Sequence, residues 1–178
     1  HRVDRRQRQM CIRDSFNREY FYQVLDGYNP TWLLIMNATR LAIETAQRYP
    51  NTQVIARSYA PADDKPLETW GTWQNFLNHV KADLAAALKP GEVIPPNLWI
   101  YTNNESGDSN ELHNYLTGLI SQPELRFVVG NYSVGTPQNV GRWNDLINFL
   151  RLVSDNRHRV VLGLSLIHIS EPTRLRRI

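Results

Sequence analysis

The sequence predicts an α/β fold in which about five parallel strands alternate with helices. Five short runs are apolar almost throughout and rich in β-branched or aromatic residues, which is typical of strands buried on both faces. These runs are residues 31–37, 52–59, 98–104, 126–132 and 159–163. Between them, apolar residues recur at steps of three and four, the spacing of amphipathic helices. Strict alternation of strand and helix is the pattern of a parallel sheet wrapped by helices.

The expected helices follow from apolar stripes and stop signals. Three stripes predict helices at residues 73–88, 112–120 and 140–150. Two shorter helices are expected at about residues 17–25 and 38–49, and Pro50 stops the second of them. The predicted order is therefore a helix, then a strand and a helix four times, then a last strand.

Both ends of the chain resemble translated sequencing-library adapter. RRQRQMCIRDS at residues 5–15 and LSLIHISEPTR at residues 164–174 are the translations of the two adapters of a transposase-based library, and the residues outside them read as sample index. We therefore interpret residues 1–15 and 164–178 as artefact and residues 16–163 as a partial domain without a natural start or stop. We expect irregular or loosely packed ends, although LSLIHIS is apolar enough to extend the last strand.

Excluding these ends changes the charge of the chain. The net charge of +3 comes from 20 basic and 17 acidic residues, and residues 16–163 retain 12 and 14 of them, a net charge of −2. The single cysteine, Cys11, also falls in the adapter-like segment. We therefore expect no nucleic-acid partner, no disulfide and no thiolate site. No apolar run approaches the roughly 20 residues of a membrane span, so no membrane partner is expected, and the compartment stays open.

Polar residues collect where the predicted strands end. Asn37 ends the first strand, Arg57 and Tyr59 lie on the second, and Asn131 and Tyr132 end the fourth. Barrel enzymes place their chemistry at the carboxyl ends of several strands, and no Gly-rich phosphate loop follows any strand here. We therefore predict an incomplete (β/α)8 barrel of the TIM type rather than a doubly wound open sheet, which has the same alternation.

The third predicted strand leads into YTNNESGD, which contains Asn103, Asn104 and Glu105. A carboxyl group in a partly apolar barrel mouth can act as a general acid, and a neighbouring amide can bind a substrate hydroxyl. The same residues also suit an ordinary loop and helix start, with Asp108 or Ser109 as the N-cap. Spacing alone leaves both interpretations open.

Four segments resemble stretches of the retaining barrel glycoside hydrolases of clan A: NLWIYTNNESG, FVVGNYSVGTPQ, GRWNDLINFLRLV and HRVVLG. The resemblance implies that Glu105 is the acid/base at the end of the fourth barrel strand and that Asn104 binds the sugar. It further implies that Arg57 orients carboxylates and that Asn131 and Tyr132 line the sugar site. Ser106 stands where that superfamily usually has proline. The nucleophile would end the seventh strand, beyond residue 163.

The resulting hypothesis is a fragment of a retaining glycoside hydrolase that acts on a polysaccharide or a peptidoglycan-like glycan. Retention needs a second carboxylate about 5 Å away, and no acid in the sequence follows a strand end suited to that role, so we expect the chain to be inactive. A barrel that binds glycans or cell walls without hydrolysing them is the main alternative, and another barrel enzyme, such as an aldolase or a deacetylase, is the second. No cofactor and no obligate protein partner are expected.

The remaining candidates are aromatic and histidine side chains. Trp70 is expected to be a sugar-stacking platform, and Trp73 and the other tryptophans are expected in the core. The histidines have no metal-ligand spacing, so we expect surface positions for His79, His113 and His158 and no metal site. We interpret Asp63 and Asp64 as a solvated turn. Because an incomplete barrel leaves unpaired strand edges and uncovered apolar faces, we also expect oligomers or partial insolubility.

Overall fold

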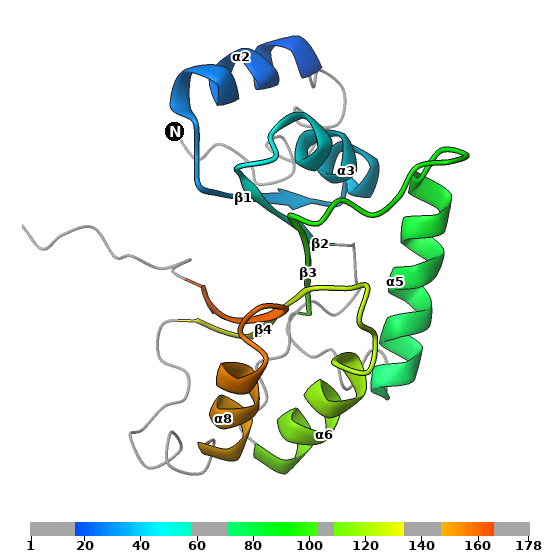
Figure 1. Ribbon diagram of the computed structural model, residues 1–178, viewed down its shortest axis with the longest axis vertical. Coiled ribbons are helices and arrows are strands. Elements are labelled where there is room, and N and C mark those ends of the chain that lie inside the picture. The colour runs from blue at the N-terminus through cyan, green and yellow to red at the C-terminus, as the bar shows by residue number, and fades with distance from the viewer. Residues whose placement is uncertain (1–16, 58–70, 103–108, 134–146, 166–178) are drawn as a thin grey trace, which may run out of the picture. The chain divides into compact units, whose positions relative to one another are not determined.

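The computed structural model describes residues 17–57, 71–102, 109–133 and 147–165 of the chain. Contacts divide the chain into two compact units, residues 1–31 and residues 32–178. The first unit contains one described helix. The second contains a parallel sheet and its helices (Figure 1).

The helix of the first unit is α2 (Arg18–Tyr28). The side chain of Asn17 caps it by accepting a hydrogen bond of 3.0 Å from the Tyr20 N–H, which satisfies a donor that the first helical turn leaves unpaired. Asn29 ends it in the left-handed conformation, with φ of 45° and an N–H that donates to the Leu25 carbonyl. The predicted helix is confirmed, and it runs to Tyr28 because the left-handed Asn29, rather than Gly27, is the stop.

Strands and helices alternate through the second unit as predicted. In chain order they are β1 (Trp32–Met36), α3 (Thr39–Arg48), β2 (Gln53–Arg57), α5 (Trp73–Ala87), β3 (Leu98–Tyr101), α6 (Ser109–Leu119), β4 (Phe127–Ser133), α8 (Ile147–Asp155) and β5 (Val160–Ser165). The sheet order is β1-β2-β3-β4-β5, and every neighbouring pair is parallel. The fold is therefore α/β, and each strand lies beside its neighbour in the sequence.

The four described helices of this unit form one layer. α3 contacts β1, β2 and β3, α6 contacts β4, and α8 contacts β5, while α3 meets α5, α5 meets α6, and α6 meets α8 (Figure 1). The Thr39 hydroxyl donates to the Asp83 carboxylate at 2.6 Å, and the rings of Phe76 and Tyr115 lie 5.9 Å apart. Ala42, Ile43, Val54, Leu116, Phe127 and Phe149 are among the fully buried core residues. The helix layer covers one face of the sheet.

The opposite face remains partly open at β1. Trp32, Leu34 and Met36 are 44%, 45% and 48% exposed, whereas Ile35, on the other face of the same strand, is buried. The prediction that the strands are buried on both faces is wrong for β1, and β2 alternates between buried and half-buried residues. It is confirmed for β3 and for the first residues of β4, because residues 98–100 and 127–129 are all buried. The described helices contact the face of β1 that bears Ile35 and leave its other face exposed.

The buried side-chain amide of Asn97 links the segments that precede β2 and β3. Asn97 lies just before β3, and its side-chain Nδ2 donates to the carbonyls of Ala46, Tyr49 and Thr52 at 2.8–3.0 Å. These carbonyls belong to the end of α3 and to the turn that leads into β2. One buried side chain therefore holds the start of β3 against the start of β2, with its amide NH₂ group fully hydrogen-bonded.

β5 extends into the adapter-like segment. Leu164 and Ser165 continue the strand after Gly163 and pair with Tyr132 and Ser133 of β4. The expectation that LSLIHIS extends the last strand is confirmed for its first two residues. Backbone pairing depends little on side-chain identity, so an unrelated apolar segment can add to a ladder that β4 already offers.

An ion-pair network joins α3 to the loop after α5. The Arg40 guanidinium forms a bidentate pair with Glu92 and bonds Glu44 at 2.9 Å and the Ala87 carbonyl at 3.1 Å. The Lys89 N–H also donates to Glu92, at 2.7 Å. The hydrogen bonds from Arg40, and then that from Lys89, lower the pKa of Glu92 from 4.5 to about 2.

Acid should weaken this network. Because the folded-state pKa of Glu92 is below its unfolded value, its stabilising contribution is complete above pH 4.5 and is lost as the pH falls toward 2. We expect the gap in unfolding free energy between wild type and Glu92→Gln to be largest near pH 7 and to shrink through that window in urea titrations. Glu124→Gln is the control, because Glu124 and Lys81 are both half-exposed and 3.8 Å apart, so its effect at pH 7 should be small. A gap that is constant from pH 7 to pH 2 would contradict this assignment.

The contact between α5 and α6 needs a glycine. A Cβ atom on Gly118 would lie 2.2–2.6 Å from three atoms of the Trp73 indole. The ring therefore packs directly over the backbone of α6, but Trp73 is half-buried rather than in the core as expected. Because an indole is rigid and held between two helices, it has little room to move away.

Gly118→Ala should lower the unfolding free energy by about 1–3 kcal/mol, although alanine is the better helix former, because the methyl group overpacks the Trp73 contact. Gly27→Ala is the matched control: Gly27 also lies in a helix, and its Cβ would meet nothing within 4 Å. That variant should leave stability unchanged or raise it by about 0.5–1 kcal/mol. Urea unfolding monitored by far-UV circular dichroism measures both, and equal effects would refute the close contact.

Candidate functional site

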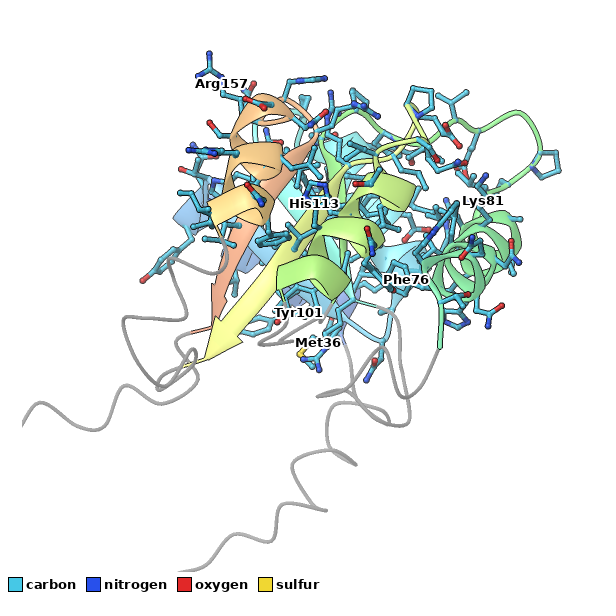
Figure 2. The ribbon with its side chains drawn as sticks, turned by 90° about the horizontal axis from the view of Figure 1, so that it is seen from below. Met36, Phe76, Lys81, Tyr101, His113 and Arg157 are labelled. Carbon is cyan, nitrogen blue, oxygen red and sulfur yellow. The ribbon has the colours of Figure 1, made fainter. Side chains whose placement is uncertain are left out.

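The carboxyl edge of the sheet brings together three neighbouring strand ends. Met36 ends β1 and pairs in register with Arg57, which ends β2. The Arg57 guanidinium carbon lies 5.2 Å from the centre of the Tyr101 ring, at the end of β3. Figure 2 shows Met36 and Tyr101 at the same end of the sheet. This cation–π contact fixes a permanent positive charge at the open face of the sheet.

Asn37 adjoins this group through its backbone. Its N–H donates to the Arg57 carbonyl at 2.8 Å, and its φ of 56° turns the chain sharply away from the sheet toward α3. Asparagine adopts this left-handed conformation more readily than most residues. Of the sequence-predicted site residues, Asn37 and Arg57 are thus brought together, and the side chain of Asn37 is exposed.

Three predicted site residues lie outside the described residues: Trp70, Asn104 and Glu105. The described part of the third strand ends at Thr102, whose N–H and hydroxyl both bond the Val128 carbonyl, at 3.0 and 3.1 Å. The chain therefore leaves β3 beside β4, two residues before Asn104. Tyr59, Asn103 and Asp108 also lie outside the described residues.

β4 carries a bulge just before the next two predicted residues. Val129 pairs with Leu162 and Tyr132 with Leu164, so β4 advances three residues while β5 advances two. Gly130 has φ of 81°, which suits the extra residue of a bulge because glycine carries no Cβ. Asn131 and Tyr132 follow in the backbone of β4, and the structure does not describe their side chains. The bulge shifts the alternation of faces by one residue beyond Gly130.

The amino end of the open face holds a second aromatic cluster. Trp99 donates its indole N–H to the Gln53 side chain at 2.7 Å, packs 5.5 Å from the Trp32 ring, and has the Arg126 guanidinium carbon 5.9 Å above it. Trp99 is buried as predicted, but the core prediction is wrong for Trp32, which is 44% exposed because none of the described helices covers this face at β1. Tyr101, two residues after Trp99, was not predicted; the period of two along β3 was the available signal.

The remaining candidates do not form a second site. His158 is exposed as expected, while His79 and His113 are half-buried, so the surface prediction is wrong for these two. They lie on α5 and α6, whose packed faces cover part of each ring. Tyr115 is buried beside Phe76, and burial raises the pKa of its hydroxyl. Within the described ranges, no three His, Cys, Asp or Glu side chains are close enough to share a metal ion. Asp63 and Asp64 lie outside those ranges.

Comparisons with known proteins give no relative. No protein-family model matches the chain, and no curated protein or solved structure is significantly similar to it. Among the described helices, none has both the length and the hydropathy needed to cross a bilayer. The described geometry and the sequence are therefore the basis for a functional hypothesis.

The bulge generates a prediction for β4. At φ of 81°, asparagine is tolerated far better than a β-branched residue. We expect Gly130→Asn to lower the unfolding free energy by about 1 kcal/mol and Gly130→Val to lower it by about 3 kcal/mol or more. Urea unfolding measures the difference, and hydrogen exchange should show loss of protection in β4 and β5 for the valine variant. Equal stability of the two variants would show that the backbone at residue 130 is not left-handed.

Proposed function

We propose that residues 16–163 are part of a (β/α)8 barrel glycoside hydrolase that cleaves a polysaccharide or a peptidoglycan-like glycan with retention of configuration. In this proposal Glu105 is the acid/base, Asn104 binds the sugar, and Arg57 orients carboxylates at the barrel mouth. The 178-residue chain itself is proposed to be inactive, because the nucleophile would belong to a later strand.

The topology supports a barrel over a doubly wound sheet. A doubly wound sheet carries helices on both faces, and its strand order reverses at a switch point. Here the strand order is sequential from β1 to β5, and the described helices contact one another in a single layer. The face that bears Trp32, Leu34 and Trp99 is apolar and contacts none of the described helices, which suits the side-chain-filled interior of a barrel.

The observation that carries the site is the cation–π contact of Arg57 with Tyr101 at the carboxyl edge. Active sites of this fold lie at that edge, and a guanidinium is well suited to hold carboxylates in a fixed orientation. Glu105 follows Tyr101 by four residues in the sequence. Its carboxyl group would protonate the leaving glycosidic oxygen and then remove a proton from the attacking water.

Retaining chemistry also explains the proposed inactivity. The second carboxylate must lie about 5 Å from the first to form the glycosyl-enzyme bond. The described strands end at Met36, Arg57, Tyr101, Ser133 and Ser165, none of them an acid. The glycosidase therefore needs a chain that continues through the strand bearing that nucleophile.

The test compares Glu105→Gln with wild type in such a longer chain. We expect the rate on natural glycan to fall by about a hundredfold to ten-thousandfold, because the leaving sugar oxygen needs a proton. Formation of the glycosyl-enzyme from an aryl glycoside with an acidic phenol should fall far less, because that leaving group departs without protonation. Burst kinetics for the aryl substrate and reducing-sugar release for the glycan measure the two steps.

Glu124→Gln is the control, because Glu124 lies between α6 and β4, at the amino end of the sheet, and should leave both rates unchanged. Equal losses on both substrates would contradict an acid role for Glu105. Tight glycan binding without turnover by the longer chain would instead indicate a glycan-binding barrel. Reducing-sugar release by the 178-residue chain would refute its proposed inactivity.

A further inference from the structure

β1 is an edge strand whose outer side is directed away from β2. The Asn37 N–H donates to the Arg57 carbonyl, and backbone groups alternate in direction along a strand. The N–H and C=O groups of Trp32, Leu34 and Met36 therefore point outward from the sheet. Among the described strands, none pairs with this side of β1. The edge therefore has a row of backbone donors and acceptors that can form hydrogen bonds with an added strand.

The same three residues expose their side chains. Trp32, Leu34 and Met36 are 44–48% exposed on the open face of the sheet. Trp32, Leu34 and Met36 therefore provide both the outward backbone groups of the edge and the exposed apolar side chains beside it. A strand added at this edge would satisfy the backbone groups and also cover part of these three side chains.

β1 also lacks the features by which natural edge strands prevent pairing with other strands. WLLIM contains no charged residue, no proline and no glycine, and β1 pairs with β2 without a bulge. Exposed edges usually carry a lysine, a proline or a bulge that blocks further pairing. The other edge strand, β5, contains Gly163, which weakens pairing. β1 is therefore the more competent edge of the sheet.

We infer that the 178-residue chain forms a two-fold symmetric dimer in which β1 of one copy pairs antiparallel with β1 of a second copy, with Leu34 opposite Leu34. A two-fold axis requires antiparallel pairing of identical strands. Centring the axis on Leu34 places Trp32 opposite the partner's Met36, so all three outward-facing residues form hydrogen-bonded pairs. This inference rests on the described sheet and goes beyond the proposed function, because it holds whether or not the parent is a glycosidase.

The register can be tested by disulfide trapping. In a Cys11→Ser background, Leu34→Cys should form an intermolecular disulfide on mild oxidation, because hydrogen-bonded antiparallel pairs have Cα atoms about 5.5 Å apart, within disulfide range. Val93→Cys is the matched control: Val93 is 76% exposed and lies outside the strands, so it should crosslink far more slowly. Equal crosslinking rates for the two variants would refute the proposed register.

Sedimentation velocity over a concentration series then tests the dimer itself. We expect a reversible monomer–dimer equilibrium for wild type and at least about a hundredfold weaker dimerisation for Leu34→Lys, because the two new charges would lie directly opposite each other. Val93→Lys should dimerise like wild type. Far-UV circular dichroism checks that Leu34→Lys keeps its fold, as expected for an exposed edge position.

Leu34→Pro provides a second, backbone-based test, since it removes the outward N–H without breaking the β1–β2 ladder. The inference is overturned if wild type is monomeric at all concentrations. It is also overturned if wild type forms open-ended polymers instead of dimers. Polymers that Leu34→Lys dissolves would indicate head-to-tail pairing of β1 with β5, and polymers that it leaves intact would indicate an interface without β1. None of these outcomes bears on the role of Glu105.

Discussion

The described helices of this protein pack in one layer against the sheet, and the opposite face is exposed only toward β1. The strands run in sequential order, and α3, α5, α6 and α8 contact one another across that layer. On the other face, Trp32, Leu34 and Met36 of β1 are 44–48% exposed, whereas Trp99 of β3 and Val128 of β4 are buried. A complete barrel resolves this by closing the sheet on itself, so that the open face becomes the interior. The sequential parallel sheet is consistent with the barrel that we propose, and the exposed face and edge of β1 are the basis for the dimer that we infer.

A buried amide at the amino ends of the strands keeps the sheet in register. Asn97 binds three carbonyls around the start of β2, on the side of the strands opposite the carboxyl edge. It fixes where β2 and β3 begin, and hence where these strands end, at Arg57 and Tyr101. This division is common in barrels, where one end of the strands supplies stability and the other carries the chemistry.

The sequence was sufficient to predict the strands, their order and their parallel direction, because the apolar runs and the helical stripes differ clearly in period. It was insufficient for features that depend on contacts between distant segments. The exposure of Trp32 depends on which face the helices cover, and the bulge at Gly130 depends on the pairing of β4 with β5. No sequence pattern indicates the role of Asn97, since its three acceptors are 45–51 positions away. At the candidate site, Arg57 was predicted from its strand end, but its partner Tyr101 belongs to another strand.

Two arginine side chains lie on the otherwise apolar face of β3. Trp99 and Tyr101 lie on the same face of β3, and each has an arginine over its ring, Arg126 at the amino end and Arg57 at the carboxyl end. A guanidinium stacked on an aromatic ring loses less solvation than one buried without a partner. Closing the sheet would bury both arginines further, and each ring would then offset part of that cost. In the proposed barrel, the arrangement at the carboxyl end would therefore keep a guanidinium beside the proposed carboxylates, which is what a site that orients carboxylates requires.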